Sequence, residues 1–317
     1  MVLNLRVLGS SSALPLSNRF PSAQFLTIAN RHFLIDCGEG TQMQLRRNRI
    51  GFGRINHIFI SHLHGDHFYG LLPLLTSLHL LDRHKELHLY GPPALEQGVY
   101  DLLKLSGARL RYPLTFHALD MQQRQRVYDD KAVSVFSFPL KHSLPCCGFL
   151  FQEKPRPRNM RKDMIEKHKI PVAEIRQIKG GANWEDEEGN SISNAELTTP
   201  PAPPLSYAYC TDTLPMSELA SLLQCKPSLL YHEATFTEEH RERARKTKHS
   251  TALQAAKVAR SVEAGHLLLG HFSIRYKERD TLLQEARNLF PNSWLAEENS
   301  DFSLKEPEKL LHQKPAN

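Results

Sequence analysis

Cysteine is scarce in this sequence, and long apolar runs are absent. The five cysteines include no CxxC pair, which argues against a disulfide framework and fits a reducing compartment. No apolar run approaches the roughly 20 residues of a membrane-spanning helix. The opening MVLNLRVLGSSSAL also lacks the basic segment and long apolar stretch of a secretion signal. We therefore expect a cytoplasmic protein that has no membrane as a partner.

The composition is that of an ordinary globular protein. Of the 317 residues, 40% are hydrophobic and 23% are charged, so a sizeable core can form. The length favours one domain with an insertion. A formal net charge of +6 is compatible with an acidic partner such as nucleic acid.

Alternating strand and helix patterns run through most of the chain and indicate the α/β class. From residue 155 to 204, prolines, charges and glycines break all periodicity, which indicates an insertion. The polar tail after Asp301 is expected to be loose. The expected strands include 4–9, 55–61, 86–92, 133–140, 206–213, 228–236 and 266–273. A hairpin of two further strands is expected to turn at 29–31 and to close with a turn at 36–38. The expected helices include 41–48, 69–81, 94–107 and 250–265.

A dense cluster of histidines follows the expected buried strand 55–61. In His62-Leu63-His64-Gly65-Asp66-His67, three imidazoles and a carboxylate lie within six residues. Positions 62 and 64 can point into one site while 66 and 67 face another, and imidazole with carboxylate suits zinc. A polar turn without metal is the alternative, but such turns rarely contain this ordered set. The segment therefore predicts ligands for two metal ions.

Three further candidate ligands follow other expected strands. His142 follows strand 133–140, Asp212 follows SYAYCT, and His271 follows HLLLG. A folded sheet can bring such strand ends to one edge, where binding residues often lie. Each zinc ion needs about four or five ligands, so these residues would complete the set.

The combined pattern resembles the metallo-β-lactamase superfamily over nearly the whole chain. The resemblance implies an αβ/βα sandwich, in which two β-sheets lie between helices, as a single domain of residues 1–317. It also implies two zinc ions per subunit. One would be held by His62, His64 and His142, the other by Asp66, His67 and His271, with Asp212 bridging them.

Five finer motifs occur along the chain. In order, they are LGSSSALPLSNRFPSAQ, Tyr209-Cys210-Thr211-Asp212-Thr213, His232-Glu233-Ala234-Thr235, His249-Ser250-Thr251 and His271-Phe272-Ser273-Ile274-Arg275-Tyr276. Together they resemble the motifs of the ribonuclease Z family. The resemblance implies a homodimeric, zinc-dependent endoribonuclease that removes 3′ trailers from tRNA precursors, leaving a 3′-hydroxyl on the tRNA and a 5′-phosphate on the trailer.

Phosphodiester cleavage also needs a proton for the departing 3′ oxygen. Near neutral pH, histidine is the suitable donor, and His249 lies outside the predicted zinc set. In the resembling family the histidine at this place assists the leaving group, and the glutamate corresponding to Glu233 orients it. The family also implies that Asp66 accepts the proton of the attacking water besides binding zinc.

The insertion, about residues 152–204, carries much of the basic charge. Between residues 152 and 179 there are nine Lys or Arg and four Asp or Glu, an excess of five that is typical of phosphate contacts. A solvated charged loop is the alternative. The resembling family has a flexible arm here that binds tRNA far from the cut. This sequence reads KIPVAEIRQIKGG, without the family's Gly-Pro motif, and the acidic run WEDEEG follows.

Two other functions compete with this prediction. One is a phosphodiesterase or esterase of the same fold that acts on small molecules, which the basic insertion argues against. The other is a non-catalytic RNA-binding protein with structural zinc, but structural sites use closed tetrahedral shells and would not need a dinuclear set.

Overall fold

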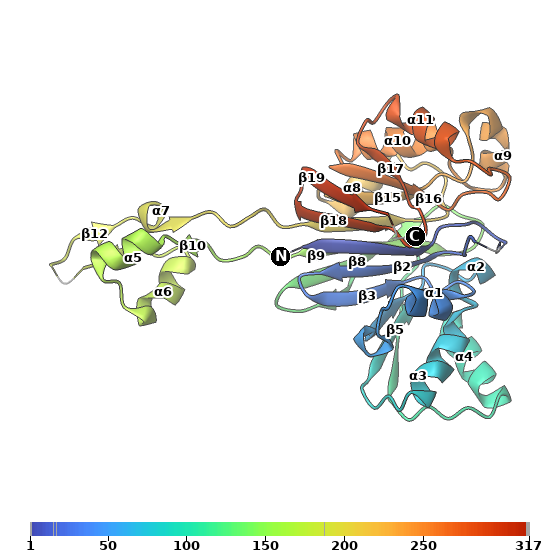
Figure 1. The fold of residues 1–317 in the computed structure, drawn as a ribbon, viewed down its shortest axis with the longest axis horizontal. Helices are drawn as coiled ribbons and strands as arrows, with labels where there is room; N and C mark the ends of the chain where they lie inside the picture. The colour runs from blue at the N-terminus through green and yellow to red at the C-terminus, as the bar shows by residue number, and fades with distance from the viewer. Residues whose placement is uncertain (1, 15, 17, 187, 315–317) are drawn as a thin grey trace. The chain divides into compact units, whose positions relative to one another are not determined.

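A computed structural model describes residues 2–14, 16, 18–186 and 188–314 (Figure 1). The chain divides into two compact units. The large unit combines Met1–Glu153 with Leu205–Asn317, and the small unit is Lys154–Pro204. In the described part of the chain, every helix is too short or too polar to span a bilayer.

The large unit contains two β-sheets. Their register follows from sequence signals such as the turn between β2 and β3, where Ala29 and Asn30 both adopt positive φ, 46° and 61°. Such a two-residue turn matches the twist of a hairpin. The first sheet runs in the order β19 (Lys309–Gln313), β18 (Asp301–Glu306), β1 (Leu3–Gly9), β2 (Ala23–Ile28), β3 (Arg31–Ile35), β4 (His57–Phe59), β5 (Leu87–Gly91) and β6 (Leu114–Ala118). The second runs in the order β17 (Ser293–Leu295), β16 (His266–Gly270), β15 (Leu229–Glu233), β14 (Ser206–Cys210), β9 (Cys146–Glu153), β8 (Val133–Leu140) and β7 (Gln125–Asp129).

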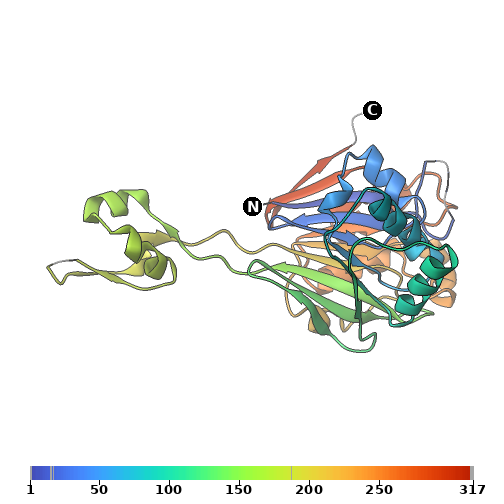
Figure 2. The same cartoon turned by 90° about the horizontal axis from the view of Figure 1, so that it is seen from below.

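Three buried apolar layers hold this unit together. The central layer, with Phe33, Phe59 and Phe149, lies between the sheets, and helices cover the outer face of each sheet (Figures 1 and 2). The expected αβ/βα sandwich is therefore confirmed. The helical segments are α1 (Thr41–Arg47), η1 (Phe52–Arg54), α2 (Gly65–Phe68), α3 (Leu71–Leu80) and α4 (Ala94–Leu105) beside the first sheet, and α8 (Leu219–Leu223), η2 (Glu238–His240), α9 (Arg241–Lys246), α10 (Ala252–Ser261) and α11 (Asp280–Arg287) after β14 in the chain.

The expectation of a loose tail after Asp301 is wrong for residues 302–313, and its last three residues, 315–317, lie outside the described part of the chain. Strand β18 pairs antiparallel with β1, and β19 pairs with β18. Phe302 and Leu304 are fully buried and belong to the central layer. Their alternation with polar neighbours is a strand pattern, which the polar composition of the tail obscures.

The small unit has its own secondary structure, so the expectation that residues 155–204 lack all periodicity is also wrong. Its core is small and contains Ile170, Ile178 and Leu197. Pro171 is the N-cap residue of α6 and has an extended backbone, so its missing N–H breaks no hydrogen bond inside the helix. The elements are β10 (Asn159–Met160), α5 (Lys162–His168), α6 (Val172–Lys179), β11 (Trp184–Glu185), β12 (Ser191–Ile192), α7 (Asn194–Leu197) and β13 (Thr198–Thr199), with β10 paired to β13 and β11 to β12.

Strand direction explains where polar residues gather in the large unit. Strands β14, β15 and β16 are mutually parallel. Strand β8 runs in the same direction, because β8 and β14 are both antiparallel to β9. In the other sheet, β3 and β4 are parallel. Residues that follow these strands therefore meet at common sheet edges.

Candidate active site

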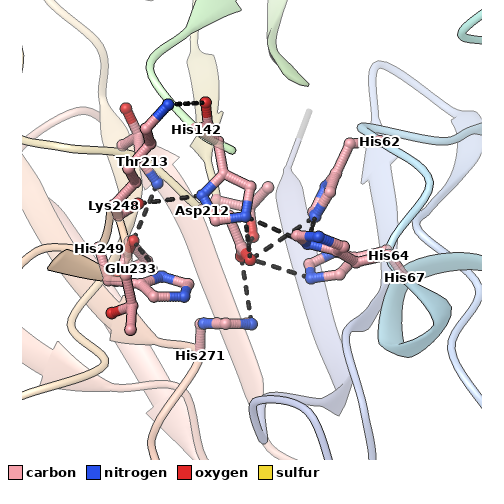
Figure 3. A network of polar contacts seen from close by, with 12 residues as sticks. His62, His64, His67, His142, Asp212, Thr213, Glu233, Lys248, His249 and His271 are labelled. Atoms are coloured by element: carbon pink, nitrogen blue, oxygen red, sulfur yellow. Dashed lines mark hydrogen bonds and ion pairs between the residues drawn. The ribbon is translucent and has the colours of Figure 1, made fainter. Parts of the chain in front are cut away.

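The polar residues that follow these strands converge on one site. Asp212 lies at its centre, and its two carboxylate oxygens face different histidines (Figure 3). Its Oδ2 lies 3.6 Å from His62 Nε2 and 3.4 Å from His142 Nε2. Its Oδ1 lies 3.3 Å from His67 Nε2 and 3.1 Å from His271 Nε2. One carboxylate thus lies between two clusters of potential ligands.

One further predicted ligand joins each cluster. His64 Nδ1 lies 3.1 Å from His142 Nε2. Asp66 Oδ2 lies 3.4 Å from His271 Nε2. The structure therefore brings together all seven residues that the sequence predicts as ligands. Donor atoms lie within 4.8 Å of one another in two groups, one with His62, His64, His142 and Asp212 and one with Asp66, His67 and His271.

Two of the histidine rings are also held by a contact at the nitrogen that does not face Asp212. His142 Nδ1 lies 3.0 Å from the carbonyl oxygen of Lys248 (Figure 3), and His271 Nδ1 lies 2.9 Å from Thr235 Oγ1. A bond at one ring nitrogen sets the tautomer and leaves the other nitrogen free to bind a metal. The contacts with Lys248 and Thr235 were not anticipated from the sequence.

Asp36 is the main residue that sequence reasoning missed, since it was interpreted only as part of a turn. Its fully buried carboxylate lies 2.7 Å from His67 Nδ1 and accepts hydrogen bonds from the Ser61 hydroxyl at 2.9 Å and the Tyr209 hydroxyl at 2.7 Å. Asp36 thereby orients His67. A carboxylate directly after the buried strand HFLI is the signal that could have revealed it.

The buried site is chemically suited to cations. Burial lowers the pKa values of His62, His64 and His142, so their neutral rings have lone pairs to offer. Burial also lowers the pKa of His67, but the Asp212, Asp66 and Asp36 carboxylates outweigh it and raise that pKa.

The Nε2 atom of His67 is also placed to bind a metal ion. It is buried and has no hydrogen-bond partner among the described residues, although it points toward two carboxylates. The carboxylates that raise the pKa of His67 stabilise positive charge at this nitrogen, and a bound metal ion would supply that charge in place of the proton. The histidine and aspartate groups therefore indicate metal binding.

Glu233 and His249 form a pair beside this centre. Glu233 is fully buried, and its Oε1 lies 2.8 Å from His249 Nδ1. The same carboxylate accepts hydrogen bonds from the Thr213 and Thr235 backbone amides at 2.9 and 3.2 Å. Burial lowers the pKa of His249, but Glu233 outweighs it and raises that pKa to about 9. His249 is therefore held in a protonated form near neutral pH.

A cavity of about 650 Å³ is lined both by residues of the Asp212 centre and by His249 of the Glu233–His249 pair. Its walls include His64, Asp66 and Asp212 from the centre, together with His249. A phosphodiester bound here would contact the potential metal ligands and the protonated histidine at once. That arrangement is suited to hydrolysis with general acid assistance.

Comparison with known proteins places these features in context. The chain is 46% identical to ribonuclease Z of Bacteroides fragilis over 300 residues, which cover 95% of this chain and 98% of that protein. It is similar to the crystal structure of human tRNase Z, short form, with a TM-score of 0.69, 26% identity, and coverage of 94% of this chain and 98% of that one. A metallo-β-lactamase fold protein of Bacillus subtilis, YhfI, matches at a TM-score of 0.67 and 16% identity, over 96% of this chain and all of that one. A family model described as Anti-Pycsar protein Apyc1 matches residues 3–154.

Proposed function

The chain belongs to the ribonuclease Z family and is an endoribonuclease of tRNA 3′-end processing; we propose that two zinc ions per subunit serve this reaction. The observation that carries the proposal is the position of Asp212 between two clusters of histidines. A single bridging carboxylate is typical of dinuclear hydrolase centres. His62, His64 and His142 would hold one ion, and Asp66, His67 and His271 the other.

Zinc in these positions would supply Lewis-acid chemistry, lowering the pKa of water and stabilising negative charge on the phosphate. The protein's own part begins with Asp66. Its Oδ2 accepts a hydrogen bond from the Ala13 backbone amide at 2.8 Å and lies on the cavity wall. We assign Asp66 a second role, as acceptor of the proton released by the attacking water. The anchored carboxylate then has a fixed direction toward the cavity.

His249 would donate the proton that the departing 3′ oxygen requires. Its Nδ1 is engaged by Glu233, so Nε2 is the nitrogen that can serve the leaving group. His249 also has a donor atom close to Asp212 and His271, but the bond to Glu233 favours proton transfer over metal binding. The products would be tRNA with a 3′-hydroxyl and a trailer with a 5′-phosphate.

The small unit would bind the body of the precursor tRNA. Its basic residues lie in 154–179, and an acidic run follows at 185–188. Over the whole of 154–204, nine Lys or Arg stand against eight Asp or Glu. Attraction to RNA therefore depends on the separation of the two charge types and not on the net charge of the unit.

From the family resemblance we also propose that the protein is cytoplasmic and forms a homodimer. Sedimentation analysis of the purified protein would test the dimer.

Incubation of the purified protein with a 3′-extended tRNA precursor tests the proposal directly. We expect one cut at the end of the acceptor stem, with a 3′-hydroxyl on the tRNA. Chelation should stop cleavage, and zinc should restore it. Metal analysis should give two zinc ions per chain. Hydrolysis of bis(p-nitrophenyl) phosphate without cleavage of the precursor would instead indicate a small-molecule phosphodiesterase.

A further inference from the structure

The cavity wall contains a cation that the chemistry described above does not use. Arg243 is the one Lys or Arg among the described residues that line the cavity, beside three acids, Glu39, Asp66 and Asp212. Within the described chain, its guanidinium has neither an ion pair nor a hydrogen bond. An arginine that faces a cavity without an acidic partner is suited to bind an anion.

The rest of helix α9 shows that this situation is specific to Arg243. Arg241 pairs with Glu238 at 3.5 Å, and Arg245 pairs with Glu242 at 3.3 Å. Both pairs lie at spacing i, i+3, and neither arginine lines the cavity. The helix thus pairs its other two arginines locally, and Arg243 is the arginine of α9 that lines the cavity.

The end of the helix connects Arg243 to the proton donor. The Arg243 carbonyl oxygen accepts hydrogen bonds from the Thr247 amide and hydroxyl, both at 3.0 Å. Lys248 then adopts a positive φ of 54°, and the His249 amide donates to the Ala244 carbonyl at 2.8 Å. Arg243, Thr247 and His249 consequently form one stretch of the cavity wall.

We propose that Arg243 binds the phosphate next to the scissile one on the tRNA side of the cut, and so favours RNA over small phosphodiesters. The proposal rests on the function proposed above. His249 serves the leaving 3′ oxygen, so its stretch of wall faces the nucleotide that departs as the new 3′ end. The phosphate on the 5′ side of that nucleotide is the nearest further anion of the chain. A guanidinium can hold it with two parallel hydrogen bonds.

The test compares Arg243→Ala with Arg245→Ala, at another exposed arginine of the same helix. Single-turnover kcat/KM is measured on a 3′-extended tRNA precursor and on bis(p-nitrophenyl) phosphate. We expect Arg243→Ala to lose roughly 10- to 100-fold on the precursor, the usual scale for a charged hydrogen bond, and much less on the small ester. Arg245→Ala should change precursor cleavage by less than about threefold. Arg243→Lys should recover part of the loss.

A neutral methylphosphonate at the linkage on the 5′ side of the leaving nucleotide identifies the phosphate. It should slow the wild type by about the same factor as Arg243→Ala, and slow Arg243→Ala little further. The same substitution at the second linkage of the trailer is the matched control and should slow both proteins equally. Equal losses for Arg243→Ala and Arg245→Ala, or an equal methylphosphonate effect on wild type and Arg243→Ala, would overturn the proposal. Failure of the wild type to cut any precursor would instead overturn the function on which it rests.

Discussion

Polar residues are held differently in the two units of this protein. In the large unit, the side chains of Asp36, His62 and Glu233 are fully buried, and each has fixed partners. In Lys154–Pro204, none of the described charged residues is buried, and pairs such as Arg161 with Asp163 lie at the surface. Buried polar groups act through geometry in a low dielectric, whereas exposed charges act through screened attraction. Changes in the first unit should therefore abolish chemistry, and changes in the second should only weaken capture.

The largest effect is expected from His64→Ala. This substitution removes a donor that lies beside both His142 and His62. We expect loss of bound metal and of all measurable cleavage, because each ion needs about four ligands. Metal analysis and precursor cleavage are measured on the same preparation. His84→Ala, at a side chain that is 71% exposed, should retain both. An active His64→Ala protein with its full metal content would contradict the dinuclear assignment.

His249→Ala should separate chemistry from metal binding. We expect full metal content and a cleavage rate lower by roughly 10² or more, the scale of general acid catalysis. Loss of metal together with activity would show that His249 is a ligand instead.

Glu233→Gln adds a pH test, because the Glu233 carboxylate raises the pKa of His249 to about 9. Protonated His249 is the active form, so activity falls as pH rises through that pKa. Removing the carboxylate should move this alkaline limb of kcat to lower pH.

A smaller loss is expected from Asp36→Asn. The amide has one acceptor oxygen where the buried carboxylate has two. It can therefore no longer accept hydrogen bonds from all the groups that donate to the carboxylate, which include His67 Nδ1 at 2.7 Å. Partners of this kind typically contribute 10- to 100-fold to metal affinity, and we expect a loss of that size in chelator competition. Tyr209→Phe removes another hydrogen bond to the same carboxylate and leaves the contact with His67, so it should lose much less. Equal losses would mean that Asp36 supports the fold and does not orient His67.

Sequence reasoning could group the candidate ligands because their signals are local. The cluster at residues 62–67 and the strand ends at His142, Asp212 and His271 point to one site, because parallel strands end at one edge. Asp36 was missed because its role depends on which side chain lies across the site. The strand that contains Phe302 was missed because its pairing with β1 joins the two ends of the chain. Residues 152–179 do carry an excess of positive charge, as counted from the sequence. Over the whole small unit, however, the acidic residues that follow offset most of that excess.

The smallest effect on chemistry is expected from removal of Lys154–Pro204. The ends of the large unit are already joined at this point, since the Glu153 amide donates to the Leu205 carbonyl at 2.9 Å and Gln152 pairs with Ser206. An Asn-Gly turn in place of the small unit would close β9 and β14 as a hairpin. We expect precursor kcat/KM to fall by about tenfold and its dependence on salt to flatten by roughly 0.7 to 0.9 per lost phosphate contact. Hydrolysis of bis(p-nitrophenyl) phosphate should fall far less, because the predicted ligands all lie in the large unit.

A variant with Gln at Lys162, Lys167 and Lys169, all exposed, keeps the small unit and should flatten the salt dependence of precursor cleavage in part. Equal loss on both substrates would mean that the small unit supports the folding of the large one, and an unchanged salt dependence in both variants would mean that its basic residues do not contact RNA.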